Sequence, residues 1–269
     1  MKQERIFLDP SDERVYIDAY LPDLRREGMP AILVIPGGGY SCVCTEREGE
    51  PIALAFLALG YAAFVLNYRV GRKEDVYPKQ LLDASRAILR IRADAAAFSV
   101  DPARVYAVGF SAGGHLCGSL ACCYDDVTEA LGIARGENRP TAVALGYPVV
   151  TLTAKTHQNS FVRLLDRPDG VFSPEEVKRF SLDERVRADS APMFLWHTAE
   201  DRVVPVDGTL LLARSLADAG VPCRLEIYPF GPHGCALGNE ITACGQAAYL
   251  QPAVVGWCAR ADYFFRSLL

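Results

Sequence analysis

A serine flanked by glycines is the feature of this sequence that most directly suggests chemistry. Residues 109–113 read Gly-Phe-Ser-Ala-Gly, after the apolar run Val105–Val108 and before a stretch of helical pattern. A serine on a strained strand-to-helix turn with small neighbours is the arrangement of a nucleophile elbow. The helix that follows would present free backbone N–H groups and the positive end of its dipole. We therefore predict that Ser111 is a catalytic nucleophile, with a plain glycine-rich turn as the alternative.

A second glycine run also follows directly on an apolar segment. Residues 36–40 read Pro-Gly-Gly-Gly-Tyr, after the run 31–35. Glycines let the backbone turn its N–H groups towards a ligand, and acyl transfer needs such donors for the tetrahedral oxyanion. The spacing matches neither a dinucleotide-binding fingerprint nor a phosphate-binding P-loop. We predict an oxyanion hole formed by Gly38 and Gly39, completed by the N–H of Ala112 next to the serine.

The general base is found by elimination, because the chain has four histidines. His115 lies four residues after the serine and is expected to pack against the sheet. His157 falls in an irregular segment, and His197 ends a strand before any suitable acid. His233 stands in a Gly-Pro-His-Gly loop after the last strand, and a serine triad of this architecture runs in the order Ser, acid, His. His233 is the predicted base, and a surface loop histidine is the alternative.

The acid is expected on the loop after the preceding strand. Residues 196–205 contain Glu200 and Asp201. Asp201 stands directly before Arg-Val-Val-Pro, which leads into the next helical pattern. We therefore predict Asp201 as the acid that orients His233, with Glu200 as the alternative. Without a catalytic role, either residue would simply be part of a charged surface turn.

The predicted strands and helices that could position these residues alternate along the chain. Continuous apolar strands suggest burial on both faces, and alternation of strands with helices is typical of a mostly parallel central sheet with helices on both faces. The segment 150–188 is polar and too long for a simple connection, so we expect a small excursion near the site within one domain of residues 1–269. The predicted strands are 15–20, 31–35, 61–66, 105–109, 142–147, 193–198 and 223–228. The predicted helices are 48–59, 79–98, one from 112 onward, 206–219 and 246–269, the last starting properly after Pro252.

Composition narrows the function classes. The chain carries 28 basic and 33 acidic residues, a net charge of −5, which gives no electrostatic reason to expect nucleic acid. No apolar run is long enough to span a membrane, and the N-terminal residues lack the apolar core of a secretory signal. A cytoplasmic location without membrane association is the expectation.

The nine cysteines fit the same expectation. Several lie inside apolar runs, where a free thiol behaves as a small buried hydrophobe. Cys42 and Cys44 are two residues apart and Cys122 and Cys123 are adjacent, so the spacing of a zinc site is missing. We expect reduced structural thiols and no metal, with disulfides or a metal site as the alternatives, and a reducing compartment agrees with this.

Five motifs together resemble the α/β-hydrolase superfamily. They also resemble its acetyl esterase and acetylxylan esterase-like branch, which is related to the hormone-sensitive-lipase group. That group usually carries His-Gly-Gly-Gly at the oxyanion loop, whereas Pro36 replaces the histidine here, so the role of that histidine is not carried over. The resemblance implies the α/β-hydrolase fold. The matching segments are 36–40, 66–69, 109–115, 195–201 and 231–234.

The resemblance further implies a carboxylic-ester substrate and no cofactor. The acyl group would be short, acetyl first, and the partner would be a small molecule or an oligosaccharide ester such as an acetylated xylo-oligosaccharide. Tyr40, next to the oxyanion glycines, and Tyr68 and Arg69, on the loop after the strand ending at residue 66, are the expected substrate contacts at the ligand-binding edge of the sheet. Buried hydrogen bonding that pins the loop is the alternative for Arg69. The sequence leaves the oligomeric state open.

Other functions stay open at this point. An arylformamidase-type amide hydrolase or a general carboxylesterase would use the same catalytic parts. A non-catalytic module that binds a small ligand is the alternative from another class. Such a module would be expected to lose a member of the triad, and Ser111, Asp201 and His233 are all present here.

Overall fold

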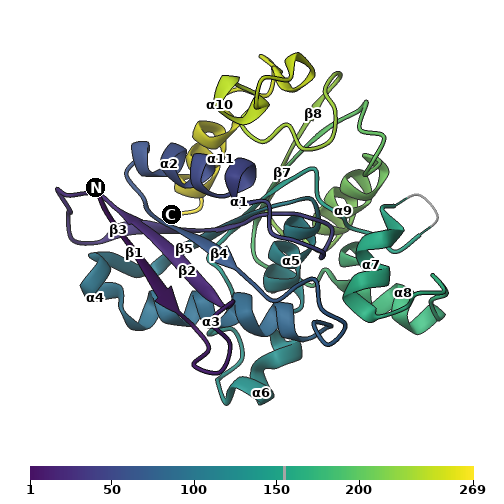
Figure 1. The fold of residues 1–269 in the computed structure, drawn as a ribbon, viewed down its shortest axis with the longest axis horizontal. Helices are drawn as coiled ribbons and strands as arrows, with labels where there is room; N and C mark the ends of the chain where they lie inside the picture. The colour runs from purple at the N-terminus through teal and green to yellow at the C-terminus, as the bar shows by residue number, and fades with distance from the viewer. Residues whose placement is uncertain (154–155) are drawn as a thin grey trace.

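A central β-sheet organises the molecule. The computed structural model describes residues 1–153 and 156–269. The described residues form an eight-stranded sheet in the order β1-β2-β4-β3-β5-β6-β7-β8 (Figure 1). Strands β3 to β8 run parallel, whereas β2 pairs antiparallel with β4, and β1 pairs antiparallel with β2. The strands are β1 (Lys2–Phe7), β2 (Tyr16–Leu21), β3 (Met29–Ile35), β4 (Ala62–Asn67), β5 (Val100–Phe110), β6 (Val143–Gly146), β7 (Met193–Thr198) and β8 (Cys223–Tyr228).

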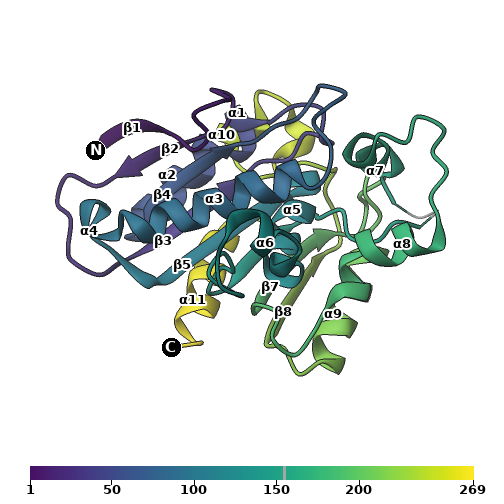
Figure 2. The same cartoon turned by 90° about the horizontal axis from the view of Figure 1, so that it is seen from below.

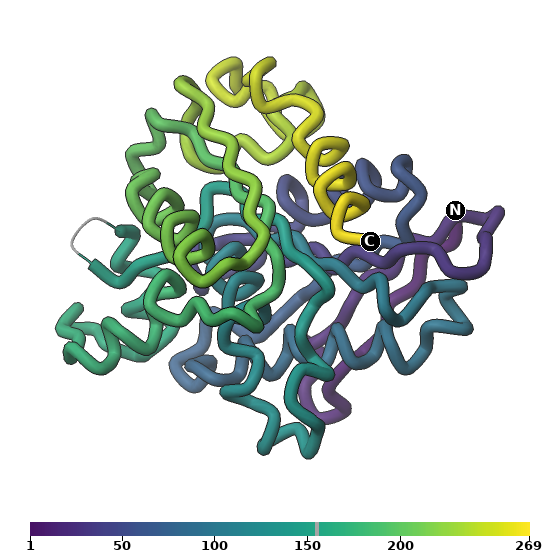
Figure 3. Tube along the Cα trace, turned by 180° about the vertical axis from the view of Figure 1, so that it is seen from behind, coloured from purple at the N-terminus to yellow at the C-terminus, as the bar shows by residue number. Residues whose placement is uncertain are grey.

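Helices cover both faces of this sheet, as predicted (Figures 1 and 2). One face packs against α3, α5 and α9, and the other against α2 and α11. Figure 3 shows the yellow C-terminal helix α11 beside the dark blue α2, where the rings of Phe56 and Trp257 have centroids 6.0 Å apart. The main helices are α2 (Glu50–Ala58), α3 (Lys79–Ala93), α5 (Ser111–Cys122), α9 (Asp207–Asp218) and α11 (Trp257–Arg266).

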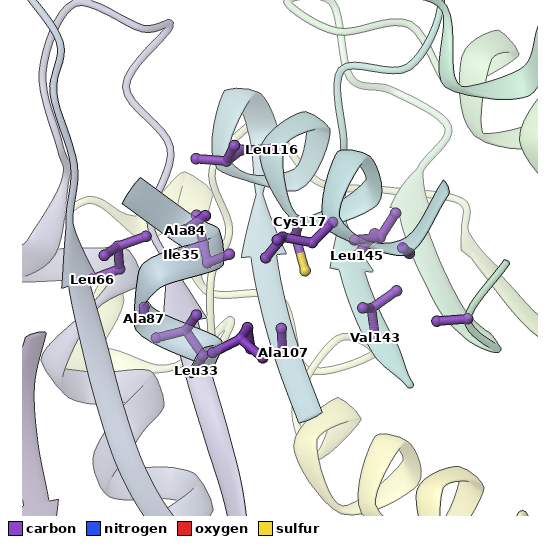
Figure 4. Packing of buried hydrophobic residues seen from close by; sticks show 14 of the residues in the cluster. Leu33, Ile35, Leu66, Ala84, Ala87, Ala107, Leu116, Cys117, Val143 and Leu145 are labelled. Atoms are coloured by element: carbon purple, nitrogen blue, oxygen red, sulfur yellow. The ribbon is translucent and has the colours of Figure 1, made fainter. Parts of the chain in front are cut away.

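The central strands are buried on both sides, which explains their unbroken apolar runs. In β3, Leu33 and Ile35 belong to the core on the α3 and α5 side, whereas Ile32 and Val34 belong to the core on the α2 side. Successive side chains of a strand point to opposite faces, so both sets must be apolar. Figure 4 shows the first core, with Cys117 of α5 among the side chains of the neighbouring strands.

Three elements differ from the sequence prediction. β1 lies outside the predicted strands because it is an edge strand, Lys-Gln-Glu-Arg-Ile-Phe, whose side chains are largely exposed. The predicted helix 79–98 is two helices, because Asp94 leaves helical geometry between α3 and α4 (Ala95–Phe98). The closing helix starts only at Trp257, since Gly256 adopts the left-handed conformation with φ 82°.

The remaining helices include those of the segment 150–188. Figure 2 shows α7 and α8 together at one end of the molecule. α8 begins with a capping box, in which the Ser173 hydroxyl accepts from the Glu176 N–H and the Glu176 side chain accepts from the Ser173 N–H. Among the described residues, no helix has both the length and the apolar character that crossing a membrane requires. These helices are α1 (Thr45–Glu48), α6 (Thr128–Leu131), α7 (Gln158–Leu165), α8 (Pro174–Phe180) and α10 (Glu240–Ala243).

Candidate active site

Ser111 stands on a strained turn between β5 and α5. It is the first residue of the helix and has φ 53°, in the left-handed region that side chains rarely adopt. The turn is tight enough to require its glycines. A Cβ atom on Gly109 would lie 2.3 Å from the carbonyl oxygen of Gly113, and one on Gly113 would lie 2.3 Å from the carbonyl oxygen of Ile35. This packing explains why the serine has a glycine two residues before it and another two residues after it.

The structure brings Ser111, His233 and Asp201 into one hydrogen-bonded chain. Ser111 Oγ lies 2.8 Å from His233 Nε2, and His233 Nδ1 lies 2.6 Å from Asp201 Oδ2. The Glu200 side chain instead accepts a 3.4 Å bond from the Gly231 N–H. Asp201, rather than Glu200, is therefore the acid behind the histidine. This geometry allows His233 to take the proton of the Ser111 hydroxyl.

The carboxylate of Asp201 is held in its charged form. Burial alone would raise its pKa, but hydrogen bonds from His197 and His233 outweigh burial and hold the pKa of Asp201 well below its usual range. The backbone N–H groups of Val203 and Val204 each donate a 2.9 Å bond to the other carboxylate oxygen. A fixed negative charge behind His233 stabilises the imidazolium that proton transfer would create.

His197 is a site residue that sequence reasoning missed. Its Nε2 donates to the carbonyl oxygen of Val204 at 2.9 Å and lies 3.2 Å from Asp201 Oδ2, while its Nδ1 lies 2.7 Å from Thr209 Oγ1. Asp201 therefore has two histidine neighbours. The only sequence signal was the four-residue separation of His197 from Asp201 across a strand end, which is too common to identify such a contact.

The predicted oxyanion loop lies beside the serine. Gly38 and Gly39 have φ 128° and 61°, and a Cβ on Gly38 would lie 2.2 Å from the carbonyl oxygen of Cys42. The Gly38 carbonyl oxygen closes the turn by accepting from the N–H groups of Ser41 and Cys42. Within the part of the chain that the structure describes, the Gly38 and Gly39 N–H groups have no acceptor of their own. Together with Ala112 in the first turn of α5, they can bind a developing oxyanion.

Tyr40, Tyr68 and Arg69, the three expected substrate contacts, are not among the residues that line the cavity over Ser111 and His233. Tyr40 is 3% exposed and donates a 2.8 Å hydrogen bond to Nδ1 of His115. Tyr68 is fully buried and donates to the carbonyl oxygen of Pro36 at 2.8 Å. Both tyrosine side chains therefore turn towards the protein interior. Their hydrogen bonds anchor the loop that contains the predicted oxyanion donors.

Arg69 follows the alternative foreseen for it. Its Nε donates to Asp83 at 3.0 Å, and the Asp83 side chain is fully buried. Burial raises the pKa of Asp83, and the hydrogen bonds and charge of Arg69 oppose that rise. The guanidinium is therefore committed to an internal ion pair and pins the loop after β4.

A cavity of about 330 Å³ opens over Ser111 and His233. Arg47 and Arg163 are among the residues that line it. Arg47 lies over the ring of Tyr249, 4.8 Å from its centroid, and donates to the carbonyl oxygen of Gly234. Arg163 comes from α7, so the segment 150–188 contributes to the cavity, and its Nη1 lies 3.4 Å from the carbonyl oxygen of Gly39. The two guanidinium groups favour a polar ligand that presents oxygen acceptors.

All nine cysteines are free thiols in the structure. Cys44 lines the cavity, but burial together with the charge of Glu48 raises the pKa of its thiol to about 12. It is therefore protonated at neutral pH and is no competing nucleophile to Ser111. No group of His, Cys, Asp and Glu side chains among the described residues could hold a metal ion.

Known proteins resemble this chain in sequence. A family model described as BD-FAE matches residues 17–216. Endo-1,4-beta-xylanase B of Butyrivibrio fibrisolvens is 39% identical over 82% of this chain, and an acetylxylan esterase of Xylanibacter ruminicola is 30% identical over 85% of it. The matched regions cover 35% and 45% of those two proteins, so the chain corresponds to less than half of these curated relatives.

Solved structures agree with the sequence comparisons over almost the whole chain. An acetyl ester-xyloside bifunctional hydrolase from Caldicellulosiruptor lactoaceticus has 32% identity and a TM-score of 0.81, covering 98% of this chain and 96% of its own. A carboxylesterase from Lactobacillus plantarum has 26% identity and a TM-score of 0.86, covering 100% and 98%. The sheet, the serine elbow after β5 and the histidine loop after β8 define an α/β-hydrolase. Within that class the chain belongs to the BD-FAE family, which agrees with the resemblance seen in its motifs.

Proposed function

We propose that this protein is a carboxylic ester hydrolase that removes short acyl groups, acetyl first, from a carbohydrate such as an acetylated xylo-oligosaccharide. The observation that carries the proposal is the chain of hydrogen bonds from Ser111 through His233 to Asp201, at 2.8 and 2.6 Å, beneath a cavity edged by free backbone donors.

In the proposed mechanism, Ser111 Oγ attacks the ester carbonyl carbon while His233 Nε2 takes its proton. The N–H groups of Gly38, Gly39 and Ala112 stabilise the oxyanion. The tetrahedral intermediate collapses, and His233 returns the proton to the leaving alcohol. Water, activated by His233, then hydrolyses the acyl-enzyme and frees the acid and Ser111.

Two observations support the choice of substrate. The relatives include an acetylxylan esterase and an acetyl ester-xyloside hydrolase, and the present chain covers nearly all of the second. Arg47, Arg163 and the two oxyanion-loop glycines Gly38 and Gly39 line the cavity. Their hydrogen-bond donors suit the oxygens of a sugar better than a long acyl chain. Tyr40 gives no support to this choice, because its side chain is buried.

The test compares kcat/KM for acetylated xylo-oligosaccharides with kcat/KM for aryl esters of two, four and eight acyl carbons and for a formyl amide. We expect acetyl release from the sugar, and a higher kcat/KM for the two-carbon aryl ester than for the eight-carbon one. A preference for the eight-carbon ester would contradict the acyl claim. Failure to deacetylate any sugar would contradict the carbohydrate claim, and turnover of the formyl amide alone would favour amide hydrolysis.

The nucleophile is tested with Ser111→Ala. We expect kcat to fall by on the order of 10⁴–10⁶ with an unchanged melting temperature, by analogy with other triad knockouts. A fluorophosphonate probe should label the parent and leave the variant unlabelled. Ordinary turnover by the variant would contradict the assignment of Ser111, and a parent that neither labels nor turns over any ester would favour a binding module.

A further inference from the structure

A buried carboxylate that the proposed mechanism does not use lies beside the oxyanion loop. Glu48 ends α1, is 5% exposed and lines the catalytic cavity. Its Oε2 accepts a 2.7 Å hydrogen bond from the N–H of Gly37, the residue before the two predicted oxyanion donors. Its Oε1 accepts a 2.7 Å bond from the hydroxyl of Tyr147. Glu48 therefore anchors the start of the oxyanion loop through the N–H group of Gly37.

Tyr147 extends this contact to the histidine loop. Its hydroxyl accepts a 3.2 Å bond from the N–H of Ala236, three residues after His233. Its ring meets the imidazole of His233 edge to face, with centroids 5.0 Å apart at 71°. The path Gly37, Glu48, Tyr147, Ala236 thus joins the two loops that carry the predicted oxyanion donors and the predicted base.

Burial of a carboxylate such as that of Glu48 destabilises the folded state, which indicates that it serves a purpose here. The hydrogen bonds to the Glu48 carboxylate come from the Gly37 N–H and the Tyr147 hydroxyl, and neither donor carries a charge. Burial raises the pKa of Glu48, and the hydrogen bonds from Tyr147 and Gly37 and the charges of His233 and Arg47 oppose that rise. An apolar side chain would fill the same space without desolvating a carboxylate. Tyr147 is itself in the left-handed region at φ 37°.

The close packing of Gly37 shows what this contact controls. A Cβ atom on Gly37 would lie 2.8 Å from Glu48 Oε2, 2.9 Å from Ser111 Cβ and 2.7 Å from the carbonyl oxygen of Phe110. The glycine backbone is therefore fitted between the carboxylate and the nucleophile. The position of the Glu48 carboxylate is thus linked by direct contact to the loop that lies against Ser111.

We propose that Glu48 and Tyr147 form a positioning pair that fixes the oxyanion loop and the His233 loop relative to each other. The inference rests on the proposed function, because it assigns the pair to the same acyl-transfer site. Among the described residues, neither side chain forms a hydrogen bond with Ser111 or with Nε2 of His233. Without the pair, the Gly38 and Gly39 donors and the imidazole of His233 would each be free to move away from Ser111, which slows the chemical step more than it weakens binding.

The test measures kcat and KM on an acetyl ester for Glu48→Ala, Glu48→Gln, Tyr147→Phe and the double variant Glu48→Ala/Tyr147→Phe. Glu50→Gln is the matched control, since Glu50 is an exposed carboxylate two residues away. We expect Glu48→Ala to lower kcat by on the order of 10²–10³, as the loss of an oxyanion donor does, and to change KM by less than about threefold. Glu48→Gln should recover about a tenth or more of the parent kcat, because its amide oxygen can still accept from Gly37.

The double variant separates positioning from independent packing effects. If the two residues act through one linkage, the double variant should have nearly the same kcat as Glu48→Ala alone, because the link is already broken. Multiplicative losses would overturn the proposal. A kcat within threefold of the parent in Glu48→Ala, with only a lower melting temperature, would also overturn it.

Two further outcomes are informative. If Glu48→Ala does not fold, Tyr147→Phe carries the same test, because it removes the hydroxyl that links the two loops, and a parent-like kcat in that variant would overturn the pair. Ser111→Ala is measured in parallel. Retained turnover there would overturn the proposed function and this inference with it, whereas an inactive Ser111→Ala beside a parent-like Glu48 series would overturn only this inference.

Discussion

The loops after β3 and after β4 end neighbouring parallel strands at the same edge of the sheet, yet they are built in opposite ways. The loop after β3 leaves the N–H groups of Gly38 and Gly39 without an acceptor among the described residues. In the loop after β4, Arg69 pairs with Asp83, and the amide of Gln80 donates to the carbonyl oxygens of Arg69 and Asp75. One loop keeps its donors for a ligand, and the other uses its charged groups internally.

This difference shows which property marks a site at a strand end. Charged and aromatic side chains at the ligand-binding edge invite assignment as substrate contacts, as Tyr68 and Arg69 did. Their burial shows that such groups also serve to fix a loop in place. Backbone donors left free beside a strained nucleophile are the more specific sign, because a folded protein rarely leaves N–H groups unpaired without a use for them.

Among variants of these two loops, the largest effect on kcat is expected from Gly38→Ala in the loop after β3. The new Cβ would overlap the carbonyl oxygen of Cys42, and φ 128° is strained for any side chain. The loop must shift, so we expect kcat to fall by on the order of 10²–10³. Gly132→Ala is the control, since Gly132 also has positive φ but has no atom near its added Cβ. A parent-like kcat in folded Gly38→Ala would show that this N–H is not an oxyanion donor.

The loop after β4 should respond in stability rather than in catalysis. Asp83→Asn removes the buried charge that pairs with the partly buried Arg69, and breaking a buried pair costs about 3–5 kcal/mol of unfolding free energy. Asp94→Asn is the control at the C-terminal end of the same helix, where the exposed pair with Arg90 is worth less than about 0.5 kcal/mol. Denaturant titration and kcat measured well below the melting temperature check both. A tenfold loss of kcat without loss of stability would place this loop in the site.

Local sequence predicted the parts of the site that depend on local geometry. A glycine-flanked serine after an apolar strand and a late Gly-Pro-His-Gly loop constrain backbone shape directly, so the residues that the structure brings together could be chosen from them. The parallel sheet followed from apolar runs for the same reason. The direction of the Tyr40 and Tyr68 side chains could not be predicted, because it is set by acceptors 75 and 32 residues away.

Contacts that no sequence motif marks could not be predicted from the sequence. Glu48 meets Tyr147 across 99 residues, and His197 reaches Asp201 only because a strand ends between them. The edge strand β1 was missed because its exposed, charged pattern carries no apolar run. In each case the decisive interaction is tertiary and is made by residue types that are common on protein surfaces.

Acid should weaken the support of the oxyanion loop through His115, whose imidazole holds the Tyr40 hydroxyl. Burial lowers the pKa of His115 from 6.5 to about 4, so the folded protein binds fewer protons than the unfolded chain between these values. This contribution to stability is complete above pH 6.5 and is lost as pH falls towards 4, a change of about 3 kcal/mol. Unfolding free energies from pH 8 to 4 should show a steeper loss for the parent than for His115→Gln. Identical slopes would contradict the buried neutral histidine.

The smallest effect is expected from Arg163→Gln, which tests how far the segment 150–188 shares in the loop after β3. The Arg163 guanidinium is exposed and touches the carbonyl oxygen of Gly39 at 3.4 Å, a long bond in water that is worth less than about 1 kcal/mol. We expect KM for an acetylated xylo-oligosaccharide to rise by about two- to fivefold with kcat unchanged, because the group can bind sugar oxygens but does not hold the loop. Arg167→Gln is the control, since Arg167 lies on the same segment but pairs with Glu176 away from the cavity. A tenfold fall in kcat for Arg163→Gln alone would show that the oxyanion loop depends on α7, and the contrast between the loops after β3 and β4 would then have to include this third segment.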